Sequence, residues 1–103
     1  IDISCSLVGS EMCIETGRLD ILAVDTNENL YVIELKKDSG YDDPYQQTKA
    51  YIDWVQKDIA LPEQQVYGII CLNGPTAKLR KDIKQDPQIR LFEYSISYTE
   101  ISG

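Results

Sequence analysis

The apolar residues of this chain fall into short runs whose spacing predicts strands and helices. Four stretches have the length and apolar content of strands, and they lie at residues 17–25, 30–36, 66–72 and 89–94. Polar residues 26–29 separate the first two, and their Asn content is typical of a hairpin loop. We therefore expect an antiparallel hairpin followed by two further strands.

Two segments have apolar residues at helical spacing. Over residues 44–58 the apolar positions, Tyr51 among them, recur on one face, and Asp43 and Pro44 are residue types favoured just before a helix and at its first position. A second, shorter helix should end before Pro87. This order of elements predicts an α/β fold in which a helix crosses over between parallel strands.

The length of 103 residues, 43% of them hydrophobic, fits a single domain over residues 1–103 with one modest core. The chain begins at Ile1 without an initiator Met, so we expect a fragment or the ordered part of a longer chain. We expect residues 95–98 to add a further short element.

Charged residues interrupt the hairpin strands at one end. If the loop is centred near Asn27, Leu22 faces Val32, and Asp20 faces Glu34 with the two Cβ atoms about 5 Å apart on one sheet face. A shift of one residue would separate the two acids, so this prediction depends on the register.

Paired carboxylates of this kind suit a metal ion. They repel and raise each other's pKa unless a cation lies between them, and Mg²⁺ or Mn²⁺ prefers oxygen ligands. Lys36 returns to the face of Glu34, where it would act on a metal-bound water or on a phosphate. The simpler interpretation is an ion pair between Glu34 and Lys36, with Asp20 solvated at the sheet rim.

The hairpin sequence resembles the PD-(D/E)XK, or restriction-endonuclease-like, nuclease superfamily. Asp20 matches its metal-binding Asp, and Glu34-Leu35-Lys36 matches its (D/E)XK element. The resemblance implies a restriction-endonuclease-like mixed β-sheet flanked by helices, and a Mg²⁺- or Mn²⁺-dependent endonuclease or exonuclease that hydrolyses DNA phosphodiester bonds. The carbonyl of Leu35 would add a ligand, and Lys36 would activate water or stabilise charge.

A second motif lies on the first predicted helix. Gln47 and Tyr51, four residues apart on its buried face, look like the QxxxY motif of RecB-type nucleases. The resemblance implies that they orient the nucleic-acid backbone or surround the site. Alone the motif is weak, because Gln is an ordinary helix residue and Tyr an ordinary core residue.

A further acid would complete the site, and Glu11 and Glu15 both precede the first hairpin strand. In NucS-type (EndoMS) endonucleases a Glu lies upstream of a Gly-x-(Ile/Leu/Val)-Asp strand, and Glu11 matches that spacing better than Glu15. The resemblance to the catalytic domain of NucS-type and RecB-family proteins runs from about Leu7 to Tyr94.

The formal charge of −7 opposes DNA binding, because a polyanion is bound through lysines and arginines. Part of the acid excess falls in one loop, at Asp38, Asp42 and Asp43. Basic residues should lie near the proposed site, namely Arg18, Lys36, Lys37 and Lys49. The basic stretch 78–84 would form a phosphate track or a solvated helix face. A homodimer or additional domains of a longer chain would supply further contacts.

Two alternatives stay open. One is a non-catalytic module on the same fold that binds protein or nucleic acid. The other is a nuclease acting on RNA or branched DNA, since the sequence does not separate substrates. Tyr41 and Tyr45 would stack on single strands or simply pack in the loop.

The composition excludes several classes of protein. There is no histidine, which removes Ser-His-Asp, Cys-His and His-ligated zinc sites. Cys5, Cys13 and Cys71 are odd in number and show no CxxC spacing, so they predict buried thiols in a reducing cytoplasm. We find no membrane span and no signal segment, and expect a cytoplasmic protein.

Overall fold

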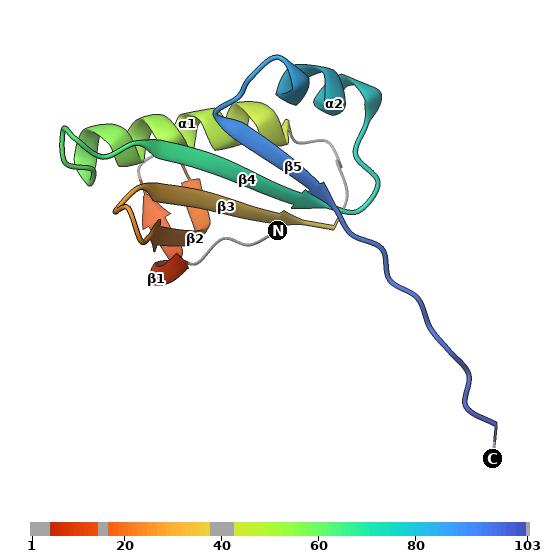
Figure 1. Cartoon of the computed structure of the whole chain (residues 1–103). Coiled ribbons are helices and arrows are strands. Elements are labelled where there is room, and N and C mark those ends of the chain that lie inside the picture. The colour runs from red at the N-terminus through yellow and green to blue at the C-terminus, as the bar shows by residue number, and fades with distance from the viewer. Residues whose placement is uncertain (1–4, 15–16, 38–42, 103) are drawn as a thin grey trace.

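The strands form one mixed sheet with both helices on the same side (Figure 1). The computed structural model describes residues 5–14, 17–37 and 43–102. Sheet order is β1-β2-β3-β4-β5, antiparallel from β1 to β3 and parallel from β3 to β5. The α/β prediction is confirmed. The elements are β1 (Cys5–Ile14), β2 (Gly17–Asp25), β3 (Leu30–Lys36), α1 (Pro44–Asp58), β4 (Val66–Leu72), α2 (Ala77–Lys84) and β5 (Ile89–Glu93).

The β2–β3 hairpin has the predicted register, with Leu22 paired to Val32. Its turn is held by Asp25, whose carboxylate accepts the backbone N–H groups of Asn27 and Asn29, each at 2.9 Å. This Asx-type bonding centres the loop where the sequence predicts it. The paired part of the hairpin ends at Ile21 and Ile33, just before the acids Asp20 and Glu34.

Helix α1 begins as predicted. The Asp43 carboxylate accepts the backbone N–H of Gln46 at 3.2 Å, and Pro44 takes the first helical position. Among the described residues no helix is long and apolar enough to cross a membrane. The core lies between α1, α2 and the sheet, and consists of Leu19, Leu22, Leu30, Val32, Tyr51, Ile52, Val55, Val66, Ile70, Leu72, Leu79, Ile83 and Ile89.

Helix α1 lies very close to β4. A Cβ on Gly68 would lie 2.7 Å from Cγ2 of Thr48 and 3.0 Å from Cδ1 of Ile52, so only glycine permits this approach. The contact sets the height of α1 above the sheet.

The edge strand β1 corrects the cysteine prediction. Of the strands that the structure describes, only β2 flanks β1, and Cys5 and Cys13 are exposed, so predicting them as buried thiols was wrong; Cys71, in a central strand, is partly buried. Leu7 and Val8 are exposed on the same strand, at 66% and 50%. The helices pack mainly on β3, β4 and β5, which leaves these side chains of β1 in water.

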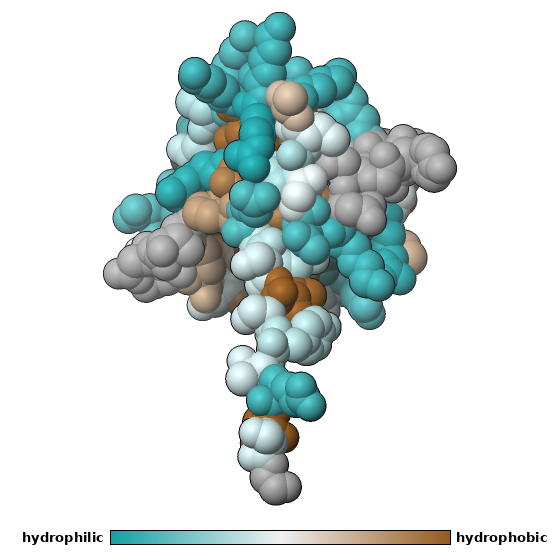
Figure 2. Space-filling model, turned by 90° about the vertical axis from the view of Figure 1, so that its right-hand side faces the viewer, coloured by the Kyte–Doolittle hydropathy of each residue, from teal (hydrophilic) through white to brown (hydrophobic). Residues whose placement is uncertain are grey.

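The chain leaves the sheet after β5 and extends away from it (Figure 1). Residues 94–102 form neither helix nor strand, so the expected short element at 95–98 is wrong. In the view turned by 90°, the surface of the domain is mostly hydrophilic (Figure 2). Hydrophobic residues are visible where the tail, residues 94–102, leaves the domain, and further along it. The exposed large apolar residues of this segment are Tyr94, Ile96, Tyr98 and Ile101.

Candidate active site

The sheet divides where the two acids lie. The β2–β3 pairing runs only as far as Ile21 and Ile33. Beyond that point β2 continues alongside β1 to Gly17, while β3 continues alongside β4 to Lys36. We call this separation the fork, and define it by Asp20, Glu34 and Leu35, the residues that face each other across it.

Side-chain hydrogen bonds replace the missing backbone pairs at the fork. The N–H of Asp20 donates to Oε1 of Glu34 at 3.4 Å, and the N–H of Leu35 donates to Oδ2 of Asp20 at 3.0 Å. Each carboxylate thus satisfies a backbone donor of the opposite strand. Asp20 and Glu34 therefore lie together, as the hairpin register implies.

Glu34 is an unusual carboxyl group because it is only 1% exposed. Burial, and after it the charge of Asp20, raises the pKa of Glu34 to about 7, while the cation of Lys36 opposes the rise. Lys36 is therefore close enough to act on this acid. A buried acid beside a second acid is the electrostatic setting that a bound cation relieves.

Glu11 lies opposite Asp20 on the neighbouring strand. Ser10 pairs with Ile21 and Met12 with Leu19, and Glu11 falls between these pairs with a φ of 48°. Left-handed conformations of this kind are uncommon outside glycine and are enriched at functional sites. A hollow of about 340 Å³ opens here, lined by Ser10, Glu11, Asp20, Ile21 and Leu35.

The Glu11 carboxylate is paired with Arg18 rather than with the other acids. Its Oε1 lies 3.4 Å from a guanidinium nitrogen of Arg18, and the side chains are 74% and 61% exposed. Within the described ranges, no three Asp, Glu, His or Cys side chains are grouped as a metal site would need. Such an exposed pair is weak, so Glu11 can exchange partners readily. Glu15 lies outside the described residues.

The two α1 residues of the second motif take different positions. Tyr51 is buried, and its hydroxyl would lie 2.7 Å from a Cβ on Gly17, three residues before Asp20. Gln47 is partly buried, and its Oε1 has no hydrogen-bond partner in the described part of the chain. A buried amide oxygen without a partner is costly, and a water or ligand bound next to Gln47 would satisfy it.

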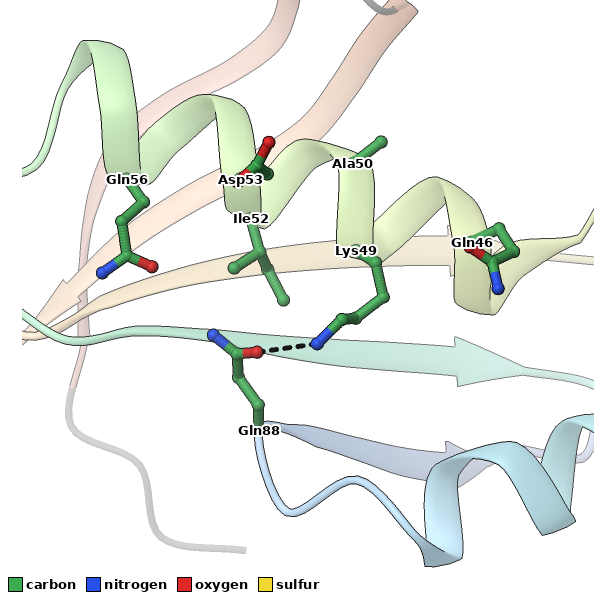
Figure 3. Close-up of a pocket in the computed structure, with 7 residues that line it drawn as sticks. All are labelled: Gln46, Lys49, Ala50, Ile52, Asp53, Gln56 and Gln88. Atoms are coloured by element: carbon green, nitrogen blue, oxygen red, sulfur yellow. Dashed lines mark hydrogen bonds between the residues drawn. The ribbon is translucent and has the colours of Figure 1, made fainter.

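Lys49 was expected near the proposed site, but it does not lie with the carboxylates. It extends to the loop before β5, where its amino group bonds Oε1 of Gln88 at 2.9 Å (Figure 3) and lies 3.0 Å from Asp86. A hollow of about 410 Å³ lies beside it, lined by Gln46, Lys49, Ala50, Ile52, Asp53, Gln56 and Gln88. Both charged residues that line this hollow are already paired, Lys49 with Asp86 and Asp53 with Lys57. The fork is therefore the better candidate for an active site.

Tyr94 is a residue of the site region that the sequence did not indicate. Its hydroxyl donates to the backbone carbonyl of Lys36 at 3.0 Å. The two residues are 58 positions apart and belong to different strand ends, so no spacing pattern could connect them. The contact depends wholly on how β5 and the following segment are placed in the sheet.

Sequence comparison identifies the family. The family model described as endonuclease NucS C-terminal domain matches residues 1–100. The chain belongs to this family. No curated protein matches the sequence significantly. The fork thus lies within the sequence that defines a NucS C-terminal domain.

Solved structures share the fold of this NucS C-terminal domain. A repair endonuclease from Pyrococcus abyssi matches 88% of the chain with a TM-score of 0.69 and 22% identity. EndoMS matches with a TM-score of 0.71 and 19% identity, over 96% of the chain in a complex with dsDNA and 95% in apo form. The chain covers only 38%, 40% and 41% of these proteins, in the same order.

Proposed function

We propose that this NucS C-terminal domain is a Mg²⁺- or Mn²⁺-dependent nuclease of the PD-(D/E)XK superfamily that hydrolyses DNA phosphodiester bonds. The observation that carries the proposal is the fork, where Glu34 is buried beside Asp20 and has a pKa of about 7. Two acids placed together in this way are disfavoured without a cation. Membership of an endonuclease family supports the same reaction.

The oxygen donors at the fork are of the type that a hard divalent cation prefers. Asp20 and Glu34 would hold it, and Glu11, opposite Asp20 and lining the same hollow, would join them after leaving Arg18. The carbonyl of Leu35 would be a further oxygen ligand. When bound, the ion would supply a Lewis acid that polarises phosphate and lowers the pKa of water.

Lys36 and Gln47 would act on the reacting groups. Lys36 lies close enough to Glu34 to lower its pKa, and its ammonium would orient the attacking water or offset the negative charge that grows on the phosphate. The unpartnered Oε1 of Gln47 can accept a hydrogen bond, so it would hold a water or a substrate hydroxyl. Tyr51 would pack against Gly17 and so hold in place β2, the strand that carries Asp20.

Double-stranded DNA is the substrate that the comparisons favour, since the related EndoMS is found in complex with dsDNA. The charge of −7 opposes this interaction. We propose that further domains or a second copy supply cationic contacts, because the related proteins are more than twice as long as this chain. Tyr45 donates its hydroxyl to Asp86 at 2.8 Å, which leaves it poorly placed for base stacking; Tyr41 lies outside the described residues.

The test is metal binding followed by cleavage. Mn²⁺ is titrated into the protein and its Glu34→Ala variant while the melting temperature is followed, and both are then assayed on single-stranded, duplex and branched DNA and on RNA. We expect that Mn²⁺ raises the melting temperature of the wild type only, and that only the wild type cleaves a substrate. Equal melting shifts in both proteins would refute the metal site, and an intact wild type that cuts no substrate would refute the nuclease.

The net charge of −7 favours one alternative function, a module that binds protein or nucleic acid without catalysis. Glu11 is paired with Arg18, as a purely structural acid would be. This alternative predicts no Mn²⁺-dependent stabilisation and full tolerance of Lys36→Ala. The same titration and cleavage assays therefore separate the two functions.

A further inference from the structure

Among the described strands, the end of β3 that carries Lys36 has a neighbour on one side only. β2 has left β3 beyond Ile33, so Lys36, the last residue of β3, is paired within the sheet only to Leu72 of β4. A strand end held on one edge moves more than one held on both. The position of the Lys36 amino group therefore depends on any other contact that fixes this end.

Tyr94 provides such a contact. Its backbone N–H donates to the carbonyl of Leu72 at 3.2 Å, and its hydroxyl donates to the carbonyl of Lys36 at 3.0 Å. One residue, placed just after β5, thus bridges the ends of β4 and β3. Because Lys36 and Leu72 face each other in the sheet, the two bonds lock the same pair of residues.

We propose that Tyr94 is a positioning residue for Lys36, an inference that rests on the proposed nuclease function. The hydroxyl holds the peptide plane that follows Lys36, and this plane together with the pairing to Leu72 sets the direction of the Lys36 side chain. Small displacements of a reacting group lower the rate of an enzyme strongly. Tyr94 acts through Lys36, and neither metal ligation nor substrate contact is required of it.

Tyr94→Phe removes the hydroxyl and keeps the ring and backbone. Tyr98→Phe is the matched control, because Tyr98 lies in the same tail, is 90% exposed and makes no described hydrogen bond. In Mn²⁺-dependent cleavage by the full protein we expect Tyr94→Phe to lower kcat about tenfold, with KM and the Mn²⁺ concentration dependence unchanged. Tyr98→Phe should cleave at the wild-type rate, and an unchanged rate for Tyr94→Phe would overturn the inference.

A double-mutant cycle distinguishes positioning from general support. In a Lys36→Ala background, measured as single-turnover rates, Tyr94→Phe should lower the remaining rate less than about twofold. A further tenfold loss there would show that Tyr94 acts independently of Lys36. As a second readout, NMR order parameters of the Lys36 side chain should fall in Tyr94→Phe and not in Tyr98→Phe.

The outcomes for the two proposals can be told apart. A wild-type protein that binds Mn²⁺ but cuts no nucleic acid would overturn the nuclease function, and this inference with it. If the wild type cleaves nucleic acid and Tyr94→Phe cleaves it at the same rate, only the role of Tyr94 is overturned.

Discussion

The hydroxyl of Tyr51 occupies the space that a side chain on Gly17 would need. A Cβ on Gly17 would lie 2.7 Å from it, and Gly17 also has a φ of 145°, which side-chain-bearing residues rarely adopt. Gly17 begins β2, the strand that carries Asp20. Helix α1 and the acid-bearing strand thus meet at a point where only glycine fits.

Gly17→Ala should lower the free energy of unfolding by about 2 kcal/mol or more, because it combines backbone strain with displacement of Tyr51. Gly74→Ala is the control. Gly74 has a φ of 72°, and a Cβ there would meet no described atom within 4 Å, so this variant reports strain alone, about 1 kcal/mol. Urea denaturation measures both. Equal losses in the two variants would mean that the contact with Tyr51 contributes nothing.

Asp20→Asn should stabilise the metal-free protein by about 1 kcal/mol at pH 8, since it removes repulsion with Glu34 and keeps an oxygen for the N–H of Leu35. It should also abolish stabilisation by Mn²⁺. Asp20→Ala, which loses that hydrogen bond as well, should be less stable than Asp20→Asn. Thermal melts in EDTA and in Mn²⁺ measure these effects, and a less stable Asp20→Asn in EDTA would mean that the negative charge of Asp20 stabilises the metal-free fold.

The pKa of Glu34 predicts how stability depends on pH without metal. This pKa lies near 7 in the folded protein against an ordinary value of 4.5, so between these values the folded state holds a proton that the unfolded state has released. The resulting contribution, roughly 2–3 kcal/mol, is fully present below pH 4.5 and is lost as pH rises through 7. The difference in unfolding free energy between wild type and Glu34→Gln, measured in EDTA from about pH 4 to 8, should show it. A difference that does not change with pH would contradict the raised pKa.

Lys36→Ala should lower DNA cleavage at least about 100-fold and leave Mn²⁺-dependent stabilisation intact, because an ammonium group is no metal ligand. Lys37→Ala, the exposed neighbouring lysine, is the matched control for lost charge. Single-turnover cleavage and thermal melts with Mn²⁺ provide the two readouts. Equal losses of cleavage in both variants would point to general attraction of DNA rather than to a role in the reaction.

The sequence predicts the hairpin and α1 well, for local reasons. The Asn-rich loop and the period of two along the strands set the pairing of Leu22 with Val32, and Asp43 with Pro44 sets the start of α1. Since these signals lie within a few residues of the features they determine, they can be read without knowledge of the fold. The same register predicts Asp20 opposite Glu34; the two residues do lie in contact, although the backbone pairing ends at Ile21 and Ile33 and the contact is made by side-chain hydrogen bonds.

The first strand could not be predicted in the same way. Gly9 and Glu11 interrupt the apolar pattern of β1, and the register with β2 shifts between Leu7 and Gly9. Leu19 and Leu22 are both fully buried although they are three residues apart, so the alternation of β2 also shifts near Asp20. Irregularities of this kind depend on tertiary packing and break the period on which a sequence prediction relies.

Contacts between distant segments were likewise beyond the sequence. The pairing of Glu11 with Arg18 and the bond from Tyr94 to Lys36 depend on how strand ends lie in three dimensions. Lys49 was expected near the proposed site and instead pairs with Asp86 and Gln88 in the loop before β5, a loop whose position in the fold the sequence does not reveal.

The fork places the two acids on strands that part from each other beyond Ile21 and Ile33. Glu11 and Asp20 lie on the β1–β2 hairpin, whereas Glu34 and Lys36 lie on the parallel part of the sheet that α1 covers. If the hairpin opened locally while the parallel part stayed folded, the acids would separate. A ligand bound by both acids would therefore stabilise the sheet against this local opening. Its affinity would fall in any variant in which the hairpin is open.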